Sequence, residues 1–124
     1  MEVAAQAIDA ALAAEAGGAD RVELFSNHME GGVTPSEGAI AVVRDHMRID
    51  LHVMIRPRGG DFCYTEHELD AMHRDISGAK RLGANGVVFG VLNPDGTVAE
   101  QQTRELAASA QPLSITFHRA FDRC

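Results

Sequence analysis

Two arginines and two glycines stand close together in the segment MIRPRGGDFCY, near the middle of the chain. Arg56 and Arg58 carry fixed positive charge, and a guanidinium can hold a carboxylate or phosphate through two parallel hydrogen bonds. Gly59 and Gly60 let the backbone approach a ligand closely, and Asp61 completes the polar stretch. The segment is therefore predicted to bind a small anionic ligand. The alternative interpretation is a Gly-Gly turn with an Arg58–Asp61 surface ion pair, which contributes little to stability.

Glu23 and His118 are the candidate acid–base groups. Glu23 lies within the apolar run RVELF, and His118 ends the run LSITFH. Side chains alternate between the two faces of a strand, so the apolar neighbours of both residues leave them on the opposite face. Histidine titrates near neutral pH and can act as a general acid or base, and Glu23 could orient it or share a proton.

The same alternation places further polar side chains on that face of the expected sheet. They are Glu2, His52 and Arg56. Charged residues are rarely buried unless they are paired or functional. One interpretation is a polar pocket in which Arg56 holds an anion, and the other is a structural ion pair between Glu23 and Arg56. Both interpretations stay open at the level of the sequence.

Three threonines each begin the same helix-start pattern. Thr34 opens TPSE, Thr65 opens TEHE and Thr97 opens TVAE, and each pattern has the spacing of a capping box. The threonines are 31 and 32 residues apart, so a structural unit is predicted to repeat along the chain. A further, alanine-rich helix over residues 6–16 is predicted without such a box.

Apolar runs of strand type alternate with these helices. They cover residues 1–4, 21–25, 51–55, 86–92 and 113–118. The β-α-β order with short connections predicts a parallel sheet with right-handed crossovers, and a unit of roughly 30 residues is typical of a TIM (β/α)8 barrel. The prediction is an α/β fold of the TIM-barrel type with five strands and four helices, an incomplete barrel. An open doubly wound sheet is the alternative, although no G-x-G-x-x-G follows the first strand.

Composition narrows the partners and the compartment. The 124 residues are expected to form one domain over residues 1–124, and the net charge of −7 argues against a nucleic-acid partner. No apolar run is long enough to span a bilayer and no signal peptide is evident, so no membrane partner is expected. The two cysteines do not make a disulfide framework, which favours a cytoplasmic location. Open parallel edges on the outer strands favour association, so a homo-oligomer is one predicted assembly.

Five segments of the chain together resemble the CutC family, often called copper homeostasis proteins. The segments are EAGGADRVEL, EGGVTPS, HVMIRPRGGDFCY, GVVFGVLNPDG and ITFHRAFD, and they follow one another over essentially the whole chain. The resemblance implies a TIM barrel of roughly twice this length, of which this chain matches the N-terminal half. It also implies a cytoplasmic protein with a role in copper homeostasis, in a family to which no reaction is firmly attached.

Copper, as Cu(I), is the metal that the resemblance implies. In some members of the family, cysteines in the first strand and at the end of the second are proposed Cu(I) ligands, and Ala4 and Phe25 stand at these positions here. Soft thiolates select Cu(I), and Cys63 and His118 are the candidate metal ligands that remain. The alternative for Cys63 is the role of a small buried hydrophobic residue.

Three classes of function follow. The leading one is a CutC-like protein of copper homeostasis that binds copper. The second is a TIM-barrel enzyme that acts on a small anionic metabolite through Arg56, Glu23 and His118. The third is a non-catalytic interaction module.

Overall fold

The computed structural model describes residues 1–117, which form one parallel sheet with helices between successive strands. The strands are β1 (Glu2–Ala5), β2 (Arg21–Leu24), β3 (Asp50–Met54), β4 (Gly86–Phe89) and β5 (Ser114–Phe117). They lie side by side in chain order, and every neighbouring pair is parallel. Sequential parallel order is the arrangement of a TIM barrel, whereas a doubly wound sheet reverses its strand order. The predicted fold class is confirmed.

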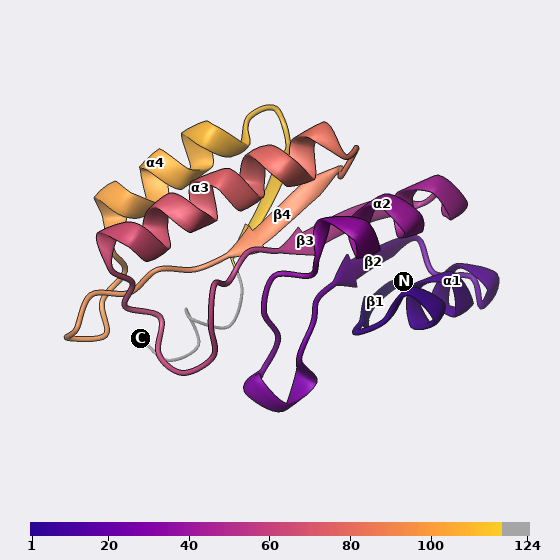
Figure 1. The fold of residues 1–124 in the computed structure, drawn as a ribbon, viewed down its shortest axis with the longest axis horizontal. Coiled ribbons are helices and arrows are strands. Elements are labelled where there is room, and N and C mark those ends of the chain that lie inside the picture. The colour runs from indigo at the N-terminus through magenta and orange to yellow at the C-terminus, as the bar shows by residue number, and fades with distance from the viewer. Residues whose placement is uncertain (118–124) are drawn as a thin grey trace.

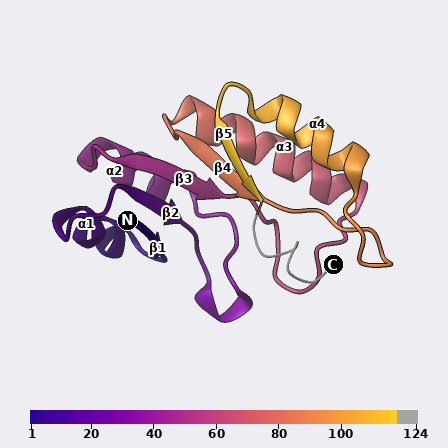
Figure 2. The ribbon, with the colours of Figure 1, turned by 180° about the vertical axis from the view of Figure 1, so that it is seen from behind.

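The helices cover one face of this curved sheet, and the loops that follow the strands project from one of its ends (Figures 1 and 2). The helices are α1 (Ile8–Ala16), α2 (Glu37–His46), α3 (Glu66–Arg81) and α4 (Glu100–Ala110), with a short 3₁₀ helix, η1 (His28–Glu30). Each α-helix packs beside the next one along the chain. Of the described helices, none is long and apolar enough to cross a membrane.

The core lies between the sheet and the helices. Val22, Leu24, Leu51, Val53 and Ile55 are all buried there, as the alternation of apolar residues predicts. The residues between them point to the other, inner face of the sheet. This separation of the two faces leaves the polar side chains of the strands around one interior.

Only one of the three predicted capping boxes is present. Thr65 caps α3, since its hydroxyl accepts from the backbone N–H of Glu68 and the Glu68 carboxylate accepts from the N–H of Thr65. The box is formed by residues three apart, so it needs no help from the rest of the fold.

The predicted box at Thr34 is wrong. Ser36 caps α2 instead, by accepting from the N–H of Ala39 at 3.1 Å. The Thr34 hydroxyl is taken up by the chain after β3, where it accepts from the N–H of Arg56 at 2.8 Å and donates to its carbonyl at 3.1 Å. The long-range hydrogen bonds to Arg56 thus replace the local cap that Thr34 was predicted to form.

The box at Thr97 and the length of the strand before it are also corrected. α4 begins at Glu100 after an uncapped Ala99, because Thr97 belongs to the preceding turn, where its N–H and hydroxyl both donate to the Asp95 carboxylate. The run predicted as a strand over residues 86–92 is a strand only as far as Phe89.

Gly86 at the start of β4 leaves room for the ring of His52 on β3. A Cβ at Gly86 would lie 2.6 Å from two ring atoms of His52 and 2.9 Å from the carbonyl oxygen of Ser114. Gly86→Ala is therefore expected to lower the free energy of unfolding by about 1–3 kcal/mol, measured by urea denaturation.

Gly38→Ala in α2 is the matched control for this substitution. A Cβ at Gly38 would meet only the Ser36 hydroxyl, at 3.9 Å, so the free energy of unfolding should stay the same or rise by up to about 1 kcal/mol. Equal losses in both variants would contradict the role assigned to Gly86.

Candidate functional site

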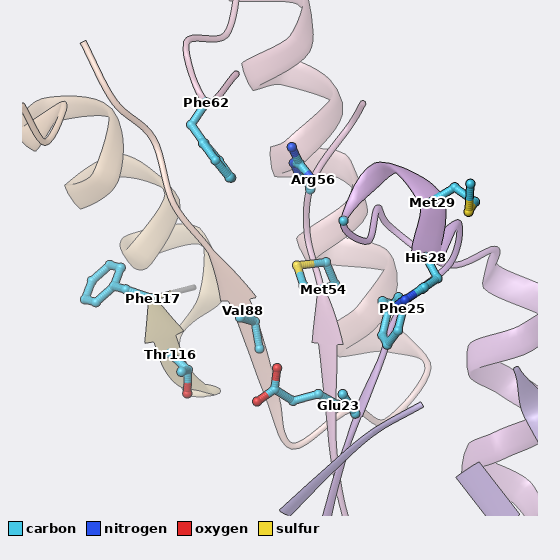
Figure 3. Close-up of a pocket in the computed structure, with 12 residues that line it drawn as sticks. Glu23, Phe25, His28, Met29, Met54, Arg56, Phe62, Val88, Thr116 and Phe117 are labelled. Atoms are coloured by element: carbon cyan, nitrogen blue, oxygen red, sulfur yellow. The ribbon is translucent and has the colours of Figure 1, made fainter. Parts of the chain in front are cut away.

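A cavity of about 570 Å³ opens on the inner face of the sheet, at the carboxyl ends of the strands (Figure 3). Its wall is largely apolar and includes Phe25, Met54, Phe62, Val88 and Phe117. Among residues 1–117, the carboxyl group of Glu23 and the guanidinium of Arg56 line it as well. In TIM barrels this end of the sheet is where substrates bind.

Strand register explains why these side chains meet. Glu23 on β2 stands opposite Ala4 on β1 and His52 on β3. Two residues further along, Met54 stands opposite Val88, and Val88 opposite Thr116. Along each strand, these inward residues alternate with buried core residues that point to the helices. The predicted inward orientation of Glu23 and Arg56 is confirmed, while their roles stay predictions.

Glu23 shares a polar environment with Glu2 of the neighbouring strand. Burial raises the pKa of Glu23 to about 7, and a hydrogen bond with the Glu2 carboxyl group and the repulsion between the two carboxylates add to the rise, which Arg21 opposes. The protonated form of Glu23 is therefore favoured over a pH range in which an ordinary glutamate is charged. Within residues 1–117, no ion pair joins Glu23 to Arg56, and the structural pairing considered from the sequence is not formed.

His52 lies beside Glu23 at the floor of the interior and is only 1% exposed. Burial lowers its pKa and the positive charge of Arg21 lowers it further, so the ring is neutral at neutral pH. Its Nδ1 atom is buried without a hydrogen-bond partner. Glu23 therefore stands beside a buried, neutral imidazole.

Arg56 is buried at the mouth of the cavity, with 4% of its surface exposed. Its guanidinium donates to three backbone carbonyls, at 2.7 Å to Glu30, 3.1 Å to Gly32 and 2.7 Å to Gly60. It also lies 4.6 Å from the centre of the Phe62 ring. Its Nε is buried without a hydrogen-bond partner, and the described chain offers it no carboxylate.

Arg58 and Asp61 lie outside the wall of the cavity. Arg58 donates to the carboxylates of Glu68 at 2.5 Å and Asp61 at 3.1 Å, and to the carbonyl of Cys63 at 2.7 Å. The backbone N–H of Cys63 and the Arg58 guanidinium both lower the pKa of Asp61. The Arg58–Asp61 pair of the alternative interpretation is thus present, and Arg58 fastens the loop to the start of α3.

The two glycines of this loop serve its packing. A Cβ at Gly59 would lie 2.0 Å from the Glu30 carboxylate, so only glycine lets the loops after β2 and β3 come this close. Gly60 has a φ of +93°, which presents its carbonyl to Arg56.

Cys63 lines a different, smaller cleft of about 240 Å³, together with Tyr64, Leu69 and Leu92. His118 lies outside the described residues. Over residues 1–117, no group of three or more histidine, cysteine, aspartate or glutamate side chains is arranged to hold a metal ion. Cys63 is therefore not part of such a group among the described residues.

Sequence reasoning missed the contribution of the loop between β2 and α2. His28, Met29 and Gly31 of this loop line the cavity, and its backbone supplies two of the acceptors of Arg56. The signal for a closely packed loop was the glycine pair after NHME, in which Gly31 and Gly32 both have positive φ.

The fold and the cavity together define the class of protein. Sequential parallel β/α units, with helices on one face and a cavity at the carboxyl ends of the strands, make this an α/β protein of the TIM-barrel type.

The chain belongs to the CutC family, whose model matches residues 1–124. It is 52% identical over 122 residues to a CutC family protein of Chromobacterium violaceum and 50% identical over 122 residues to the human copper homeostasis protein cutC homolog, each match covering 98% of this chain. These matches take up 49% and 45% of the two relatives, so the chain spans about half the length of the curated relatives it matches. The resemblance seen in the sequence is confirmed.

A solved structure agrees with this relation. The crystal structure of CutC from Streptococcus agalactiae superposes with a TM-score of 0.92 at 35% identity, covering 98% of this chain and 59% of that one. The arrangement of the described strands and helices is thus that of the family.

The raised pKa of Glu23 gives a pH dependence with a defined sign. The native state binds a proton more tightly than the unfolded chain, so this group's stabilising contribution is full below about pH 4.5 and is lost as the pH rises to about 7. Because Glu23 is partly exposed, we expect about 1–2 kcal/mol of stability to be lost over this window.

Urea unfolding measures this contribution when the unaltered chain and Glu23→Gln are compared at each pH of the window. The difference between their free energies of unfolding cancels the contribution of other titrating groups. Glu66→Gln, at an exposed position, is the control and should follow the unaltered chain. Identical pH profiles for Glu23→Gln and the unaltered chain would rule out the raised pKa of Glu23.

Proposed function

We propose that this protein binds a small organic anion in the cavity and exchanges a proton with it, as a TIM-barrel enzyme does. The observation that carries the proposal is the buried guanidinium of Arg56, which lines the cavity and has no carboxylate partner among the described residues. Glu23 is the proton-exchanging group of the proposal.

A buried cation is unfavourable unless its charge is balanced. Three carbonyl dipoles stabilise Arg56 in part, but they carry no net charge. An anionic group in the cavity would supply the missing charge, and the unpartnered Nε–H offers it a donor. Arg58 differs from Arg56, because the carboxylates of Glu68 and Asp61 already balance the charge of its guanidinium. Arg56 is therefore the anion-binding group of the loop, with Gly60 holding it in place.

A carboxyl group with a pKa of about 7 is suited to proton transfer at neutral pH. It is present in both protonation states there, so it can donate to a ligand or accept from one. The neighbouring Glu2 helps to hold the pKa of Glu23 in this range. His118, the other acid–base candidate, is not needed for this step.

Replacement of Arg56 tests the anion site. Inorganic phosphate and acetate should raise the melting temperature of the unaltered chain, and Arg56→Met should abolish that shift because it removes the positive charge that faces the anion. Arg56→Lys keeps the charge with fewer hydrogen bonds and should retain part of the shift.

Arg74→Ala removes a charge from an exposed position outside the cavity wall and is the control. Far-ultraviolet circular dichroism checks that each variant is folded. A folded Arg56→Met variant that still binds phosphate like the unaltered chain would refute the proposal.

A role in copper homeostasis is also proposed for this chain, and it rests on the names of its relatives. Direct binding of Cu(I) would use the soft donors of the sequence. Ala4 and Phe25, which line the cavity, stand at the positions where the resemblance implies cysteine ligands for Cu(I) in some members of the family. Cys63 lies in the separate cleft. These described residues do not fit a thiolate site for Cu(I), so the proposed role does not run through copper held on Cys63.

Competition for Cu(I) against a chromophoric chelator tests this view. We expect Cys63→Ser to leave the copper affinity of the chain unchanged, because a single thiolate without a second soft ligand holds Cu(I) weakly. Stoichiometric copper binding that is lost in Cys63→Ser would show that Cys63 is a ligand after all.

A further inference from the structure

The charged groups of the cavity lie at two different levels along the strands. Glu23 stands opposite His52 on β3, and Arg56 comes four residues after His52 in the same extended segment. At about 3.3 Å per residue, the two levels are roughly 13 Å apart. One small anion cannot contact both levels unless it carries an extended body.

An apolar belt separates the two levels. Met54 and Val88 stand opposite each other in the sheet between the level of Glu23 and that of Arg56, and Figure 3 shows Met54 between these two side chains. Phe25 adds an aromatic wall beside them, held against Gly32, where a Cβ would lie 3.2 Å from the ring. The order along the cavity is therefore the guanidinium of Arg56, the apolar belt and the carboxyl group of Glu23.

We propose that the ligand of this cavity is an amphipathic monoanion with a polar group at its far end. Its carboxylate or phosphate binds Arg56, a chain of several carbons lies along Phe25, Met54 and Val88, and a hydroxyl or carbonyl group meets Glu23. This inference rests on the proposed function and adds to it the class and the length of the ligand.

Each part of the description has its own physical reason. A neutral ligand would leave the charge of Arg56 unbalanced. A second negative charge at the far end would meet the carboxyl group of Glu23, in a place where burial already disfavours the charged form of that group. A short anion would leave the apolar belt in contact with water, and burying methylene groups there raises affinity by roughly fourfold each.

Isothermal titration of the 124-residue chain with four probes tests the inference. The probes are inorganic phosphate, octanoate, ω-hydroxyoctanoate and octanediol, of which the last has the same carbon chain without the charge. We expect octanoate to bind at least tenfold more tightly than phosphate, the terminal hydroxyl to add about fivefold, and octanediol to bind more weakly than octanoate.

Two variants assign these gains to residues. Met54→Gln keeps the length of the side chain but makes the belt polar, so it should weaken octanoate binding about fivefold and leave phosphate binding unchanged. Glu23→Leu should abolish the gain from the terminal hydroxyl and leave octanoate binding unchanged or tighter. Should either variant fail to fold, the comparison of the four probes on the unaltered chain decides alone.

The outcomes separate this inference from the proposed function. Equal affinities for phosphate, octanoate and ω-hydroxyoctanoate, all lost in Arg56→Met, would refute the amphipathic ligand and leave the anion site intact. Binding of octanediol as tight as that of octanoate, with no effect of Arg56→Met, would refute both.

Discussion

The buried guanidinium of Arg56 organises the carboxyl end of the sheet. Its hydrogen bonds to Glu30, Gly32 and Gly60 join the loop after β2 to the loop after β3. These loops form much of the cavity wall, so the shape of the cavity depends on this one side chain. A lysine could not make the same set of contacts, because its ammonium group lacks the planar arrangement of donors.

The position of Arg56 explains the roles of several residues around it. Thr34 pairs with the backbone of Arg56 and so cannot cap α2, which Ser36 caps instead. Gly59 gives Glu30 room beside the loop. The charge of Arg56 is held by dipoles and by the Phe62 ring rather than by an acid, which leaves that charge free to act on a ligand. The same residue thus shapes the cavity and, in the proposed function, binds in it.

The names of the CutC relatives and the chemistry of this cavity suggest different ligands. The names of the relatives concern copper, and Cu(I) requires soft ligands that converge on one point. The cavity instead combines a guanidinium cation, an apolar belt and the carboxyl group of Glu23, which is the make-up of a site for an organic molecule. A protein can affect copper levels without holding the metal, so the two observations do not conflict.

Local patterns in the sequence determined the elements and the two faces of the sheet. The alternation in RVELF and LHVMIRP assigned the core residues and put Glu23 and Arg56 on the inner face, and the box at Thr65 forms because its two residues are only three apart. These predictions succeeded because alternation and short-range hydrogen bonds depend only on neighbours in the chain. Only the tertiary structure decided that Arg56 bonds to carbonyls up to 26 residues away, that burial raises the pKa of Glu23, and that Thr34 pairs with Arg56 and does not cap α2. Such contacts join segments that the sheet brings together, and a polar side chain takes the partner that burial makes available rather than the nearest one in sequence.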